Sequence, residues 1–294
     1  PAAPRAAASA RATADGRARQ GGRRAEVECR RSHGLTGGDG DWPRVALLLV
    51  QLEGQLTDGD SYVYQAAVNA YVAAANVASA RVLDTLARHL GDAAARADAE
   101  MCAHARARER AREGADVGGG VAIEHEQAEP GIGPALAQAL KLTQAICQVV
   151  QRVGAAMGSH ARVVTPVLLR CCDARAPRLL NAGALVALAD TCVAAGAGFH
   201  PWAPALVEVC AAALAADADD ADVRRAAAQA LNLVMAALGA QLIDMAGAPA
   251  VKQAYRALTL VRERASDELL VRHAACALGE LERACLRLLF PSAR

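Results

Sequence analysis

The stretch DSYVYQAAVNAY, residues 60–71, begins with polar residues and continues with small apolar residues at helical spacing. Its core, VYQAAVNAY at 63–71, returns 160 residues later as VRRAAAQAL at 223–231. VRHAACALG at 271–279 repeats the opening, and PRLLNAGAL at 177–185 is a weaker copy. Each copy follows an acidic turn and a shorter apolar segment. This unit, repeating at about 40 residues, predicts a HEAT-type helical solenoid.

The repeat assigns structural roles to particular positions. Small alanines let neighbouring helices approach closely, and an aspartate before a helix caps its N-terminus. Arg224 is expected to reach an acidic turn of its own or a neighbouring repeat, and Tyr71 is expected to fill the core position of Leu231. The predicted signature consists of Asp60, Tyr64, Ala67, Tyr71, Val223, Arg224, Ala227, Leu231, Val271, Arg272 and Ala275.

Four segments follow from composition. Residues 1–41 are rich in arginine and glycine and poor in large apolar residues, which predicts a disordered tail. Residues 42–90 are read as the first HEAT-type helices, with one helix from Ser79 to a stop at Gly91. Residues 91–131 are read as an insertion, a solvated helix followed by a flexible loop. Residues 132–294 hold the remaining repeats and a terminal capping segment, giving an all-α, HEAT/armadillo-type solenoid of about five helix pairs.

Charge, hydropathy and cysteine usage indicate which binding partners and which cellular compartment to expect. The formal net charge is +1, so no general attraction of the folded part to nucleic acid or anionic membranes is expected. No run approaches the length of apolar sequence that spans a bilayer, which predicts no transmembrane segment. The nine cysteines form no Cys-x-x-Cys pair, which favours reduced thiols in a cytosolic or nuclear protein. Because the sequence begins with Pro1, we expect a fragment or a processed product.

No constellation of residues predicts catalysis. Ser159 and His160 are adjacent, which is not the arrangement of a catalytic triad, and no Gly-x-Ser-x-Gly elbow occurs. Cys102 and His104 lack a second pair at the spacing of zinc ligands. The sequence therefore predicts no catalytic residue, no cofactor and no metal site.

Two aromatic residues are candidate partner contacts. Tyr62 stands just before the repeated positions, and Trp202 lies in FHPWAP, a loop between predicted repeats. Loops on one edge of a solenoid often meet partners. The alternative for Trp202 is that it packs with Phe199 and holds neighbouring repeats together.

The tyrosine-rich block also resembles a known family. DSYVYQAA matches a block in the carboxy-terminal region of the RNA polymerase II assembly factor family, also called transport and Golgi organization protein 6, at Asp60, Ser61, Tyr62, Val63, Tyr64 and Ala67. FHPWAPALVEVC with the following VRRAA resembles a later helix pair of the family. The closing DELLVRHAACALGELERACLRLLFP resembles its terminal segment, at Val271, Arg272, Ala274, Leu278, Leu281, Phe290 and Pro291. The long acidic loop within 91–131 and the segment before Trp42 depart from the family.

The resemblance implies a non-enzymatic scaffold with protein partners. These would be RNA polymerase II subunits and assembly chaperones, in a role in polymerase assembly and nuclear import, or Golgi and coat proteins, in a role in secretion. It implies a cytoplasmic location, with shuttling to the nucleus or peripheral association with the Golgi. The alternative is a generic solenoid transport adaptor of the importin or vesicle-coat type, in which the tyrosine block is a coincidence.

Overall fold

The computed structural model describes residues 42–56, 58, 60–116, 132–173, 175–215 and 220–290, and the side chains of 42–45 and 111–116 are not described. The tail predicted at 1–41 and the loop predicted at the end of 91–131 lie outside the described residues. The helical stack described below lies within Leu48–Arg294.

Every regular element in the described part of the chain is helical, and no strand occurs there. The helices are α2 (Trp42–Gln55), α3 (Ser61–Asp116), α4 (Pro134–Val153), α5 (Ala161–Cys171), α6 (Arg178–Ala195), α7 (Ala203–Ala215), α8 (Ala221–Leu238), α9 (Ala240–Ala246), α10 (Ala248–Arg264) and α11 (Glu268–Leu289). Two 3₁₀ turns, η1 (Gly154–Ser159) and η2 (Gly196–Trp202), follow α4 and α6.

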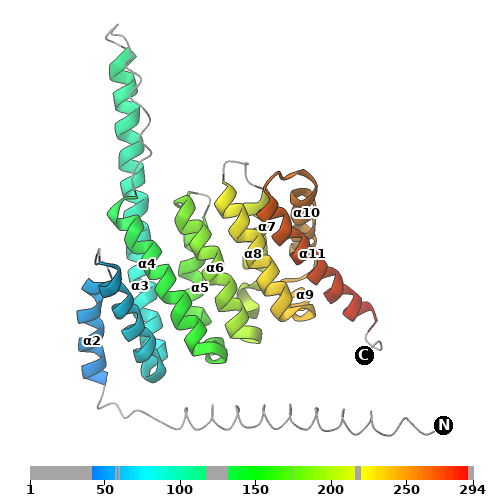
Figure 1. Ribbon diagram of the computed structural model, residues 1–294, viewed down its shortest axis with the longest axis horizontal. Coiled ribbons are helices and arrows are strands. Elements are labelled where there is room, and N and C mark those ends of the chain that lie inside the picture. The colour runs from blue at the N-terminus through cyan, green and yellow to red at the C-terminus, as the bar shows by residue number, and fades with distance from the viewer. Residues whose placement is uncertain are drawn as a thin grey trace, which may run out of the picture. The chain divides into compact units, whose positions relative to one another are not determined.

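The helices form two layers. In one layer α3, α4, α6, α8 and α11 pack side by side, each against the next (Figure 1). In the other layer α5, α7 and α10 cover them, with α5 against α6, α7 against α8 and α10 against α11. Burial between the layers is continuous along the stack, because each amphipathic helix meets a neighbour on its apolar side. The prediction of an all-α helical solenoid is therefore confirmed.

The long helix α3 contains a break and continues past a predicted end. Ala78 leaves helical geometry (φ −138°, ψ 49°), so a new segment begins at Ser79 as predicted. The prediction that Gly91 ends this segment is wrong, since α3 runs on to Asp116. Gly91 does not adopt the positive φ of a helix-ending glycine, and it is followed by good helix formers. Ala93 and Ala97 are buried beyond it, so tertiary packing extends the helix.

Past Glu100 the helix leaves the stack. Residues 101–110 are all exposed. The boundary predicted at residue 91 therefore falls inside a helix, and packing ends about ten residues later along α3. The division of the chain into four segments stays a prediction.

The two 3₁₀ turns bring backbone into close contact. α4 and α6 both end at glycines of positive φ, Gly154 at 56° and Gly196 at 52°. A residue with a side chain rarely adopts this backbone conformation. In the turns that follow, a Cβ placed on Gly198 would lie 2.6 Å from the Cα of Gly158 and 2.7 Å from its carbonyl oxygen. Only glycine at 198 allows this approach between η1 and η2.

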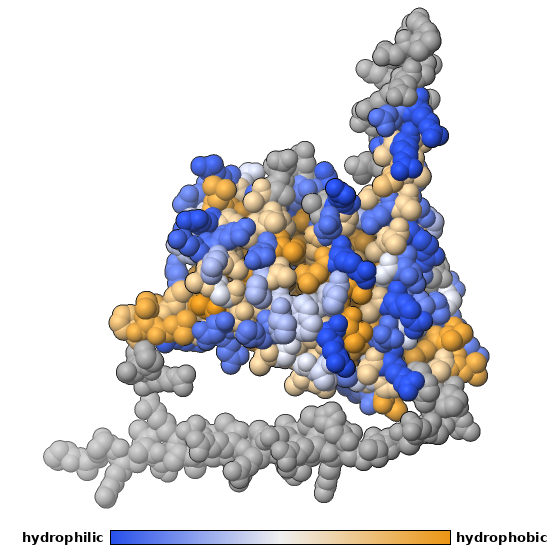
Figure 2. All heavy atoms as spheres, turned by 180° about the vertical axis from the view of Figure 1, so that it is seen from behind, coloured by the Kyte–Doolittle hydropathy of each residue, from blue (hydrophilic) through white to orange (hydrophobic). Residues whose placement is uncertain are grey.

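The last turns of α11 are apolar and unpacked. Apolar side chains gather at the α11 end of the stack (Figure 2), where Leu286, Leu288, Leu289 and Phe290 are exposed. A terminal repeat of a solenoid normally presents a polar outer face to solvent. The last turns of α11 present apolar side chains to solvent instead of a polar face.

One helical stretch is apolar enough, by length and composition, to match a membrane span. It covers Arg178–Ala215, that is α6, η2 and α7, and half of the matching window is buried within the stack. The bent pair α8 and α9 passes the same test only when taken together. Core helices of soluble proteins pass this test too, so the finding is weak evidence for a membrane segment.

Candidate partner-binding surface

The start of α3 is held by two aspartates. Asp60 accepts a hydrogen bond at Oδ1 from the Tyr62 N–H (2.7 Å), and its carbonyl accepts one from the Tyr64 N–H (3.0 Å). Asp58 Oδ1 accepts one from the Asp60 N–H (2.9 Å). The two bonds to carboxylate oxygens satisfy N–H groups that the start of a helix leaves unpaired, and the Tyr64 bond is the first backbone hydrogen bond of the helix. Asp60 thus caps the first turn of α3.

Tyr64 joins α3 to α4. Its hydroxyl lies 3.0 Å from the Lys141 carbonyl oxygen and 3.1 Å from Gln144 Oε1, and can donate to either. The Lys141 ammonium lies 5.2 Å from the centre of the tyrosine ring and donates to the Asp58 carbonyl. Burial raises the pKa of Tyr64 to about 12. The ring is therefore a neutral packing element with a cation–π neighbour.

Tyr71 joins α3 to α2. Its side chain is fully buried, and its hydroxyl donates to the Leu49 carbonyl oxygen at 3.1 Å. Burial raises the pKa of Tyr71 to about 12 as well. Ala67, one turn earlier, is also fully buried. Two of the three tyrosines of the block are therefore explained by packing.

Tyr62 is not explained by packing, because it is 85% exposed at the first turn of α3. Trp202 differs, because it is half-buried and its ring centre lies 6.0 Å from that of the fully buried Phe199. An aromatic contact at this distance stabilises the packing of the two rings. The geometry at Trp202 therefore favours packing against Phe199 over contact with a partner.

The two candidate contacts lie at opposite edges of the stack. Residues 61–77 run parallel to α4, since Tyr64 meets Lys141 and Asn76 accepts from Arg152 Nε at 3.0 Å. α4 in turn runs parallel to α6, because Thr143 lies beside Gly183 and Gln151 bonds Asp190. Tyr62 marks the start of these helices, whereas Trp202 follows the end of α6. They do not form one site.

The buried register of the later copies is set by the helix N-caps. Pro177, Asp220 and Asp267 precede α6, α8 and α11. In each of these helices the residues three, seven and eleven positions after the cap are buried. They are Leu180, Ala184 and Leu188 in α6, Val223, Ala227 and Leu231 in α8, and Leu270, Ala274 and Leu278 in α11. In α11 this stripe lies one residue before the predicted one. Val271 is consequently half-buried, and Arg272 and Ala275 are exposed.

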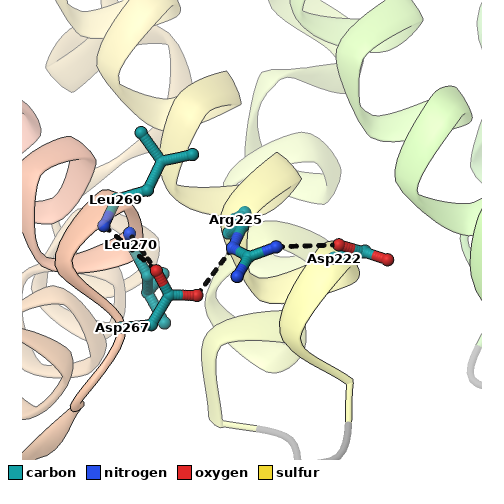
Figure 3. Close-up of polar contacts among 5 residues, drawn as sticks. All are labelled: Asp222, Arg225, Asp267, Leu269 and Leu270. Atoms are coloured by element: carbon teal, nitrogen blue, oxygen red, sulfur yellow. Dashed lines mark hydrogen bonds and ion pairs between the residues drawn. The ribbon is translucent and has the colours of Figure 1, made fainter.

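Arginines link successive helices of this layer. Arg225 Nε donates to Asp267 Oδ2 at 2.6 Å, and its Nη1 donates to Asp222 Oδ1 at 3.1 Å (Figure 3). Between α6 and α8, Arg178 Nε lies 2.5 Å from Asp220 Oδ1. The aspartate at the N-cap position of one helix is thus paired with an arginine of the helix before it. The prediction gave this role to Arg224, which points elsewhere because successive residues of a helix differ by about 100°.

Asp267 also caps α11 directly, since its Oδ1 accepts hydrogen bonds from the Leu269 N–H (3.0 Å) and the Leu270 N–H (3.1 Å). The bond from Leu270 and the pairing with Arg225 hold the pKa of Asp267 below its usual value. A lowered pKa in the folded state means that the unfolded chain binds the proton more readily. The Asp267 carboxylate therefore stabilises the folded state above about pH 4, and this stabilisation is lost as pH falls.

Replacing Asp267 with asparagine is expected to make stability less sensitive to acid. Wild type and Asp267→Asn should differ most near pH 6 and converge between about pH 4 and pH 2, because protonation removes the charge that the variant lacks. Urea unfolding at a series of pH values measures this. Asp92→Asn, at an exposed position, is the control. A constant difference between wild type and Asp267→Asn across this range would contradict the assignment.

Other polar groups in the described residues show no catalytic arrangement. Ser159 Oγ donates to the Ala156 carbonyl (3.0 Å), while His160 Nε2 lies 3.0 Å from Ser79 Oγ, so the adjacent serine and histidine serve different contacts. Burial, with Arg162 nearby, lowers the pKa of His160. Burial raises the pKa of the Cys147, Cys171, Cys172, Cys192 and Cys210 thiols, which makes them poor nucleophiles. Within the described ranges, no three His, Cys, Asp or Glu side chains gather at metal-binding distance.

Comparison with known families gives a match over part of the chain. Residues 40–156 match the family described as "Required for nuclear transport of RNA pol II C-terminus 1". Comparison with curated proteins finds no match. The matched residues include the tyrosine-rich block and α4. They confirm over that range the family resemblance drawn from DSYVYQAA.

Proposed function

From the match of residues 40–156 to the family required for nuclear transport of RNA polymerase II, we propose that this chain is a non-enzymatic helical scaffold in that transport. It binds polymerase subunits or their assembly chaperones in the cytoplasm and accompanies them to the nucleus. The observation that carries the proposal is the family match over the DSYVY block. A stack of helix pairs suits the role, because solenoids offer extended surfaces for large partners.

The exposed tyrosine of the block is the proposed point of contact. Tyr64 and Tyr71 are buried and hydrogen-bonded, so their presence follows from the fold. Tyr62 is 85% exposed and has no packing role. Tyrosine is enriched among the residues that dominate protein interfaces, since it combines apolar area with a hydroxyl group. Tyr62 is therefore the residue of the block that is free to meet a partner.

The family match does not support the other roles that the resemblance implied. Its description names nuclear transport of the polymerase and gives no support to Golgi organisation or secretion. It also favours the family over a generic importin or coat adaptor, because the block lies within the matched range. The residues beyond 156 are assigned to the same scaffold as part of this proposal.

Affinity capture from cytosol with the whole chain tests the proposal. We expect RNA polymerase II subunits among the captured proteins, and we expect Tyr62→Ala to reduce their amount several-fold, since interface tyrosines often contribute more than 1 kcal/mol. Tyr255→Ala, at another exposed tyrosine on α10, should leave capture unchanged. Failure to capture any polymerase subunit would overturn the proposal. Equal loss in both variants would overturn the role of Tyr62.

A further inference from the structure

A pocket lies at the edge of the stack where α7 ends and α8 and α11 begin. It has a volume of about 630 Å³, within the usual range of ligand sites. Four helices and the turn between α10 and α11 contribute to it. Its lining residues are Leu214, Ala215, Ala221, Arg224, Arg225, Leu260, Val261, Arg264, Ala265, Ser266, Asp267 and Leu270.

The charges in the pocket are unbalanced. Arg225 is engaged by Asp267 and Asp222, as Figure 3 shows. Arg224 is not: its Nε is buried and has no hydrogen-bond partner among the described residues. A buried donor without a partner is costly, and more so when it is charged. Arg224 is only half-buried, and its Nη1 and Nη2 are not among the buried unpaired atoms, so an oxyanion in the pocket would meet the guanidinium there.

Arg264 adds a second cationic group. It lines the same pocket from the end of α10, with an exposed side chain that forms no ion pair among the described residues. Arg224 and Arg264 therefore face the pocket from two different helices. Guanidinium groups bind carboxylates through paired hydrogen bonds, so two of them can hold an acidic ligand.

The remaining wall is apolar. Leu214, Leu260, Val261 and Leu270 line it, and Leu260 is 43% exposed. A ligand that fits both walls carries a large apolar group next to its carboxylate. Asp267 lies in the pocket and Asp222 lies on the far side of Arg225, which disfavours a dianionic group such as phosphate.

We propose that this pocket binds an acidic peptide segment of a protein partner, with a carboxylate on Arg224 and Arg264 and a neighbouring apolar side chain on Leu260 and Val261. The inference rests on the proposed function only in taking the ligand from a protein. Because a peptide assay requires no polymerase, the two proposals can fail separately.

Fluorescence anisotropy of the whole chain with short labelled peptides tests this site. The probe alternates glutamate with leucine and phenylalanine. We expect binding that weakens with added salt, and a loss of about tenfold or more when glutamine replaces glutamate, since hydrogen bonds between charged groups are the strong ones. A peptide with phosphoserine in place of glutamate should bind less tightly.

Variants locate the site. Arg264→Gln and Arg224→Gln should each weaken binding of the glutamate peptide about tenfold. Arg264 is exposed, so its replacement is not expected to disturb folding, and thermal unfolding of both variants checks this. Arg272→Gln, at an exposed arginine outside the pocket lining, is the matched control. The proposal is overturned by no binding, by binding that survives both pocket variants, by equal loss in Arg272→Gln, or by tighter binding of the phosphoserine peptide.

Discussion

Replacement of Tyr71 with alanine is expected to lower the free energy of unfolding by about 3–5 kcal/mol, the usual range for deleting a large buried aromatic side chain. The ring is fully buried between α2 and α3, and its hydroxyl donates to the Leu49 carbonyl oxygen at 3.1 Å. Deletion leaves a cavity and also leaves the Leu49 carbonyl without this donor. Urea denaturation followed by circular dichroism at neutral pH measures the loss.

Two further variants separate the ring from its hydroxyl. Tyr71→Phe keeps the ring and removes the donor, so a smaller loss of about 1–3 kcal/mol is expected. Tyr62→Ala removes an exposed tyrosine from the same block and should change stability by no more than about 0.5 kcal/mol. If Tyr62→Ala cost as much as Tyr71→Ala, the assignment of one tyrosine to the core and the other to the surface would be wrong.

Replacement of Gly198 with alanine is expected to cost about 1–3 kcal/mol or more, because overpacking forces a backbone shift. The added Cβ would lie 2.6 Å from Gly158 Cα and 2.7 Å from its carbonyl oxygen. Both atoms belong to backbone, so no flexible side chain can move aside. Thermal unfolding and urea denaturation of the whole chain measure the effect.

Gly279→Ala is the matched control, and it should raise the stability of the protein where Gly198→Ala lowers it. Gly279 lies within α11, and a Cβ there would meet no atom within 4 Å. Alanine is favoured over glycine inside a helix by about 0.5–1 kcal/mol, so this variant should be more stable than wild type. A stabilised Gly198→Ala would show that η1 and η2 do not pack as described.

Much of the fold could be predicted because helix periodicity and capping are local properties. The break before Ser79 and the cap at Asp60 both follow from a few neighbouring residues. The end of α3 could not be predicted in this way. Gly91 carries a stop signal, and it is overridden because Ala93 and Ala97 find partners in the stack. Burial of these two side chains depends on where other helices lie, which no local pattern records.

The sequence also could not decide which arginine of α8 pairs with Asp267. Arg224 and Arg225 are adjacent, so the sequence can place an arginine near the acidic turn without deciding which one reaches it. Only the rotation of α8 against α11 directs Arg225 to Asp267, and it leaves Arg224 Nε without a partner among the residues that the structure describes. The pocket itself was not foreseen, because its lining residues come from four helices.

By itself the sequence determined the helical class and the family resemblance at DSYVYQAA, since both are written in contiguous residues. The tertiary structure decided the register of α11, where counting from the cap at Asp267 buries Leu270 and leaves Val271 half-buried. It also separated Tyr62 from Trp202 by placing them at opposite edges of parallel helices. The physical reason is that a helix fixes which residues share a face, but only its packing against neighbouring helices fixes which face is buried.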